Sequence, residues 1–112
     1  MATATKPTAP LPLRELRSAL GLSREKMGRL LEVSARTIER WEATGKTPSR
    51  PSMRRRFEQL QEIVELGRIG YTPEGLVYFL QTPFPTFDGR TGLQLIEIGE
   101  GKRVFGVLAG EY

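Results

Sequence analysis

The chain contains no cysteine and no histidine, and its single aspartate in 112 residues is Asp88. Without cysteine there is no disulfide, no thiolate nucleophile and no cysteine-ligated metal. Without histidine there is no imidazole base and no ordinary zinc or copper site. The carboxylates are scattered along the chain, so no acid–base pair is indicated. We therefore expect a protein that is not an enzyme and that needs no cofactor and no metal.

Long hydrophobic runs are also missing. No stretch approaches 18 consecutive apolar residues, which is about the length that a membrane-spanning helix needs, so no such helix is expected. Residues 1–10 carry one lysine and no apolar segment, which differs from a secretory signal. A length of 112 residues suits one modest domain, or two very small ones that share a core.

The net charge of +4 is unevenly divided along the chain. Residues 1–56 hold thirteen Lys and Arg against five Glu, a net charge of +8. Residues 57–112 hold four Lys and Arg against eight acidic residues, a net charge of −4. This asymmetry indicates that the first half faces a polyanion and that the second half faces a different partner.

The first half has apolar residues at helical spacing between capping and stopping residues. Residues 1–12 are rich in Thr, Ala and Pro, which predicts a disordered arm. A helix is predicted from Leu13 to a stop at Gly21. After it we expect a helix capped by Ser23, another capped by Ser34 that ends near Gly45, and a long helix from Ser52 to residues 67–70.

The second half continues the helical pattern. Thr72 followed by Pro73 is a strong helix start. Residues 82–90 form a predicted loop, which Phe84 and Phe87 are expected to hold against the core. Thr91 and Gln94 have the spacing of a capping box for a helix that runs through Ile98, and residues 99–101 interrupt it before a last helical segment from Val104. Because nothing nearby offers a pairing strand, the fold class is predicted to be all-α.

Residues 24–43, REKMGRLLEVSARTIERWEA, have the spacing of a helix-turn-helix. They resemble the Cro/repressor-like Xre family, whose pattern runs roughly Ala-x-x-x-Gly-Val-Ser-x-x-x-Ile-x-x-Trp-Glu. The matching residues are Val33, Ser34, Ile38, Trp41 and Glu42. The sequence departs from the pattern at Gly28, where Ala is usual, and at Glu32, where Gly is usual. We expect Glu32 to adopt a positive φ, at a cost of about 1 kcal/mol or more.

The resemblance implies DNA binding by the second helix of the motif, whose first turns enter the major groove. The positions that match its groove-facing side are Ala35, Arg36, Thr37 and Arg40. Two of them, Arg36 and Arg40, are candidates for bidentate recognition of guanine, although they could also simply solvate a helix face. The expected phosphate contacts are Arg24, Ser34, Lys46 and Arg50. Trp41 is expected in the core, and the run at residues 54–56 either touches the DNA backbone or is solvated.

The acidic half resembles the toxin-binding domain of antitoxins of the Xre/MbcA/ParS type. The resemblance lies in an apolar helix ending at Thr82 and Pro83, the Gly-Arg-Thr helix start at residues 89–91, and a Leu93-x-x-Ile96 segment. Phe84 stands where Asn is common, and Gly92 where Pro is common. Together with the helix-turn-helix, the resemblance covers residues 13–112.

The resemblance implies a type II antitoxin that binds a RES-type toxin, or one of a related ADP-ribosyltransferase-like fold, and obstructs its active site. Such toxins consume NAD⁺ or modify proteins with it. The resemblance also implies repression of its own operator. The residues we expect to contact the toxin are Lys102, Arg103, Val107, Glu111 and Tyr112. The implied segments are a disordered arm (1–12), a helix-turn-helix region with a long connecting helix (13–66) and a toxin-binding domain (67–112). The implied location is the bacterial cytoplasm, at the nucleoid when the operator is bound.

Two alternatives stay open from the sequence. One is a stand-alone repressor whose acidic half serves only dimerisation. The other is an interaction module that has lost DNA binding, for which Gly28 and Glu32 provide the reason. A homodimer or a larger toxin–antitoxin assembly is expected, because one recognition helix covers only a short half-site. The long helix from Ser52 is the expected dimer surface.

Overall fold

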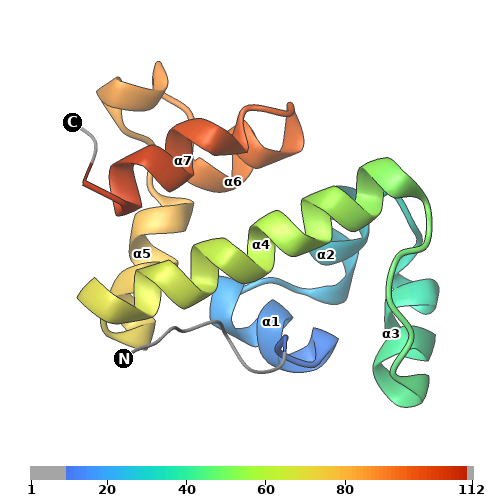
Figure 1. The fold of residues 1–112 in the computed structure, drawn as a ribbon. Helices are drawn as coiled ribbons and strands as arrows, with labels where there is room; N and C mark the ends of the chain where they lie inside the picture. The colour runs from blue at the N-terminus through green and yellow to red at the C-terminus, as the bar shows by residue number, and fades with distance from the viewer. Residues whose placement is uncertain (1–9, 111–112) are drawn as a thin grey trace, which may run out of the picture.

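A computed structural model describes residues 10–110, and these residues fold into α-helices joined by short loops (Figure 1). The helices are α1 (Leu13–Leu20), α2 (Arg24–Leu31), α3 (Ala35–Thr44), α4 (Pro51–Gly70), α5 (Pro73–Gln81), the 3-10 turn η1 (Pro85–Phe87), α6 (Gly92–Glu97) and α7 (Gly101–Leu108). Extended pairing in this range is limited to an isolated bridge between Phe84 and Arg90. The predicted all-α class is confirmed.

Four helix starts lie where the capping residues predicted them, whereas α7 starts at Gly101, three residues before the predicted Val104. The hydroxyl oxygens of Ser23, Ser34 and Thr72 each accept a hydrogen bond from a backbone N–H three residues later. Thr91 forms the full capping box with Gln94, and α6 ends at Glu97, one residue before the predicted end. Helix α4 starts at Pro51 rather than at the predicted residue, because proline is pre-organised for the first helical position.

Helix α4 is long and runs through the middle of the molecule, with α1–α3 on one side of it and α6–α7 on the other (Figure 1). The buried apolar side chains other than Met53 form one cluster, to which every helix from α1 to α7 contributes. On α4, Phe57, Leu60, Ile63 and Val64 are buried, whereas Leu66 is half-buried. The basic and acidic halves of the chain therefore share a core.

Polar side chains also join the two halves. Gln81, at the end of α5, donates from Nε2 to the carbonyl oxygens of Leu20 and Gly21, at 3.0 and 2.9 Å. Arg56 of α4 donates to the carbonyl oxygens of Leu30 and Glu97. These carbonyls lie at helix ends, where no partner is available within the helix. Side-chain donors thus satisfy them across the junction between the halves.

The loop after α5 is held by aromatic packing, as predicted. Phe87 is 1% exposed, and Phe84 is half-buried. Their rings meet edge to face with centroids 6.1 Å apart, and both pack near the ring of Phe79 from α5. Ile98, through which this helix was predicted to run, is 52% exposed because α6 has already ended. In the part of the chain described, no helix is both long and apolar enough to span a membrane.

Candidate DNA-binding and partner-binding surfaces

The turn between α2 and α3 has the geometry that its sequence predicted. Glu32 adopts φ +60° and ψ +42°, the left-handed conformation in which glycine is usual. The N–H of Val33 donates to the carbonyl oxygen of Gly28 at 2.9 Å and closes the turn. A Cβ atom on Gly28 would lie 2.4 Å from the carbonyl oxygen of Val33. The backbone approaches so closely here that the alanine usual at this position would require a shift of the turn.

The predicted base-reading residues lie on the first turns of α3. Arg36 and Arg40 are exposed, while Ala35 and Thr37 are half-buried. The Thr37 hydroxyl oxygen accepts hydrogen bonds from the Ser34 hydroxyl at 3.1 Å and from Arg40 Nη2 at 3.5 Å. Ser34 Oγ in turn accepts from the N–H of Thr37 at 3.1 Å. This local network orders the start of α3 and leaves the Arg36 side chain projecting from it.

The four predicted phosphate contacts are in different surroundings. Lys46 is exposed on the loop after α3, and Ser34 is engaged as the cap of α3. Arg50 pairs with Glu32 at 3.1 Å, which ties the loop before α4 to the turn of the motif. Both partners of that pair are more than half exposed, so the pair itself adds little stability. Arg24 is held by Glu42.

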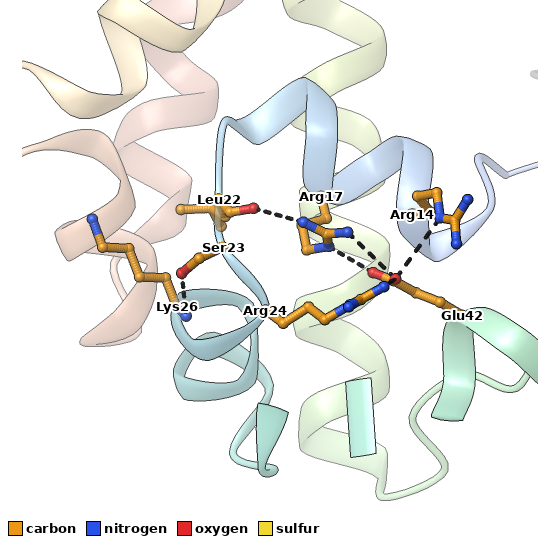
Figure 2. A network of polar contacts seen from close by, with 7 residues as sticks. All are labelled: Arg14, Arg17, Leu22, Ser23, Arg24, Lys26 and Glu42. Atoms are coloured by element: carbon orange, nitrogen blue, oxygen red, sulfur yellow. Dashed lines mark hydrogen bonds and ion pairs between the residues drawn. The ribbon is translucent and has the colours of Figure 1, made fainter. Parts of the chain in front are cut away.

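Glu42 is the centre of an ion-pair network that links three helices (Figure 2). Its side chain is 1% exposed. Arg17 of α1 donates from Nε to Oε2 at 2.6 Å, and Arg24 of α2 donates from Nη2 to Oε1 at 3.0 Å. Arg14 approaches Oε1 at 3.9 Å, and Arg17 also donates to the carbonyl oxygen of Leu22 at 3.1 Å. One carboxylate therefore fixes how α3 sits against α1 and α2.

The electrostatics of Glu42 follow from this arrangement. Burial would raise the pKa of the Glu42 carboxyl, but hydrogen bonds from Arg17 and Arg24, together with their charges, lower it below its ordinary value. The carboxylate is thus ionised at neutral pH and binds the Arg24 guanidinium at 3.0 Å. Sequence reasoning noted Glu42 as part of a family pattern and did not assign this role.

The basic run at residues 54–56 does not act as one unit. Arg54 donates to the carbonyl oxygen of Ser49 at 3.4 Å, and Arg55 is exposed. Arg56 turns inward and reaches backbone carbonyls of α2 and α6.

Trp41 packs half-buried against the edge of the core, as expected for a structural rather than a base-stacking residue.

The predicted toxin contacts that the structure describes lie on α7, but their surroundings differ. Lys102 is exposed on α7, whereas Val107 is half-buried against the core. Arg103 donates to the carbonyl oxygen of Thr86 at 2.8 Å and pairs with Asp88 at 3.3 Å and Glu100 at 2.9 Å. Arg103 thus braces the loop around η1, a role that sequence reasoning missed. Glu111 and Tyr112, also predicted as toxin contacts, lie outside the described residues.

The comparisons with known proteins agree with this geometry. Residues 12–69, more than half of the chain, match the helix-turn-helix domain family. The chain belongs to this family. No curated protein sequence matches it significantly. Among residues 10–110, no group of three or more acidic side chains is placed to hold a metal ion.

The fold of this helix-turn-helix protein is similar to a solved structure over nearly its full length. The match is to a chain in the crystal structure of the MbcT-MbcA toxin–antitoxin complex of M. tuberculosis. It has a TM-score of 0.71 and 21% sequence identity, and it covers 88% of each chain. The similarity therefore extends beyond the helix-turn-helix into α5–α7.

Proposed function

We propose that this helix-turn-helix protein is an antitoxin that binds operator DNA and neutralises a RES-type toxin by direct contact. The observation that carries the proposal is the combination of two features in one chain. One is a helix-turn-helix, and the other is an α5–α7 region within a fold shared over 88% of its length with a chain from a toxin–antitoxin complex. The acidic charge of residues 57–112 supports a partner other than DNA for that region.

The DNA-binding part of the proposal rests on α2 and α3. Arg36 and Arg40 are exposed on the first turns of α3, and the N-terminal residues of a recognition helix are the ones that contact base edges. Lys46 and Arg50 flank them and would neutralise phosphates. A dimer would place two such helices in successive major grooves, which is why we propose a homodimer or a larger assembly on the operator.

The toxin-binding part rests on residues 67–112. We propose that the end of the chain, with Glu111 and Tyr112, enters the active site of an NAD-consuming toxin and obstructs it. Lys102 is exposed on α7, and Arg103 binds the loop around η1 through the carbonyl oxygen of Thr86. An ordered surface lowers the entropy lost on binding, which favours affinity. In this proposal the complex forms in the bacterial cytoplasm.

Co-expression with the RES-type toxin tests the toxin-binding part. The full chain should restore growth and copurify with the toxin, whereas deletion of residues 111–112 should abolish neutralisation and leave operator binding intact. Arg55→Ala, at an exposed site on α4, is the matched control and should neutralise as the parent does. Growth inhibition by the toxin despite the full chain, without a complex, would leave the stand-alone repressor as the better interpretation.

Titration against the promoter of its own gene at several salt concentrations tests the DNA-binding part. We expect a preference for the operator over unrelated DNA, and an affinity that falls steeply with salt because counterions are released from the phosphates. An affinity that does not change with salt, or no operator preference, would contradict DNA recognition.

A further inference from the structure

Arg56 is the one half-buried member of the basic run, and it reaches into the junction between the two halves. Its Nη1 donates to the carbonyl oxygen of Leu30 at 2.8 Å, and its Nη2 donates to the carbonyl oxygen of Glu97 at 3.3 Å. Leu30 is next to the last residue of α2, and Glu97 is the last residue of α6. A single guanidinium therefore joins the C-terminal ends of two helices that are 67 residues apart in the chain.

The chemistry of these two ends suits a guanidinium. The last carbonyls of a helix have no donor within the helix, and they carry the negative end of its dipole. Arginine has a planar fork of donors that can serve two acceptors at once, whereas lysine is a single point charge. Arg56 supplies both the missing donors and the positive charge. The contact thus depends on the shape of the side chain as well as on its charge.

The two helices that Arg56 joins belong to different functional surfaces. Helix α2 packs directly against α3, which carries the exposed arginines proposed to read the operator. Helix α6 packs directly against α7, which carries the surface proposed to meet the toxin. On the basis of the proposed function, we propose that Arg56 is a positioning residue that couples the two surfaces. Toxin binding at α7 then alters operator affinity, and operator binding alters toxin affinity by the same factor.

Hydrogen exchange of the backbone amides provides a test that needs neither DNA nor toxin. Thr91→Ala removes the capping box of α6 and should loosen that helix locally. In the parent chain it should also speed exchange at Glu32 and Val33, after the end of α2. In an Arg56→Ala background, Thr91→Ala should speed exchange only in α6 and after it. Two outcomes would overturn the coupling. One is that Thr91→Ala still speeds exchange at Glu32 and Val33 in the Arg56→Ala background, and the other is that it does not speed their exchange in the parent chain.

Operator affinity measured over a double-mutant cycle tests the same coupling at the functional surface. Thr91→Ala should weaken operator binding about two- to fivefold when Arg56 is present and leave it unchanged in the Arg56→Ala background. Arg56→Lys retains the charge and should behave as Arg56→Ala does. Arg55→Ala removes the same charge from the adjacent exposed position and should retain the full effect of Thr91→Ala.

The two experiments separate the ways in which the inference can fail. If Arg55→Ala and Arg56→Ala weaken operator binding equally and with the same change in salt dependence, Arg56 is a phosphate contact and the coupling is wrong. If no operator binding is found for any variant, the proposed function fails. In that case the exchange experiment still decides whether Arg56 couples the two helix ends.

Discussion

Arg17 and Glu42 are 25 residues apart in the chain, and their side chains meet at 2.6 Å between α1 and α3. Arg24 of α2 binds the same carboxylate at 3.0 Å. The relative placement of the three helices therefore depends on one buried acid and the two arginines that satisfy it. Because α3 carries Arg36 and Arg40, this network also determines where the proposed base-reading side chains are presented.

The stability of the protein should depend on pH through Glu42. Its pKa is lowered in the folded state from an ordinary value of 4.5, so the unfolded chain takes up the proton first as the pH falls. The stabilisation is present in full above about pH 4.5 and is lost as the pH falls through the lower, folded pKa. Chemical denaturation between pH 3 and pH 7 should show this loss, and Glu42→Gln should remove that part of the profile.

At pH 7, Glu42→Gln should lower the free energy of unfolding by about 1–3 kcal/mol, because it leaves the partly exposed Arg17 and Arg24 without their counter-charge. Glu39→Gln is the matched control, since it makes the same change at an exposed position of α3. It should change the stability by less than about 0.5 kcal/mol. Equal effects of the two substitutions would mean that the network does not stabilise the fold.

Gly28→Ala should destabilise the protein although alanine is the better helix former. The gain in helix propensity is about 1 kcal/mol, but the new Cβ would lie 2.4 Å from the backbone oxygen of Val33. Overpacking against backbone costs about 1–3 kcal/mol, and we expect a net decrease in the midpoint of thermal unfolding. Gly70→Ala, at the end of α4 where a Cβ would meet nothing within 4 Å, should be neutral or slightly stabilising.

Substitutions on the proposed DNA surface should separate base recognition from phosphate contact. Arg36→Ala and Arg40→Ala should each reduce discrimination among operator variants by about 1–3 kcal/mol. Lys46→Ala should weaken binding to all sequences about equally and lower the salt dependence by about one counterion. Fluorescence anisotropy at several salt concentrations measures both quantities. If Arg36→Ala behaves like Lys46→Ala, Arg36 contacts phosphate rather than a base.

Adjacent cations on α7 should behave differently on substitution. Arg103→Ala should speed amide exchange at residues 86–90, because Arg103 donates to Thr86 and pairs with Asp88. Lys102→Ala removes the same charge from an exposed neighbour and should leave that exchange unchanged. Toxin affinity, measured by calorimetry, should fall for both. If toxin affinity falls for Arg103→Ala alone, Lys102 does not contact the toxin, and this region acts only through the loop that Arg103 holds.

Local patterns were sufficient to predict most helix boundaries. The hydroxyl caps at Ser23, Ser34, Thr72 and Thr91 all lie at the predicted starts, because a cap is a contact between residues only a few positions apart. The positive φ of Glu32 was predictable for a related reason, since the turn of the motif requires it whatever residue is present. The roles of Glu42, Arg56 and Arg103 were not predictable in this way.

The amino-acid sequence by itself determined the class of the fold, the positions of the helices, the helix-turn-helix and the separation of charge between the halves. These properties depend on composition, periodicity and short-range hydrogen bonds. The tertiary structure alone decided which arginines remain at the surface and which are held inside. Arg55 and Arg56 are neighbours of the same type, yet one is exposed and the other binds carbonyls of α2 and α6. The difference arises from the direction in which α4 presents each side chain and from the helix ends that packing places beside it.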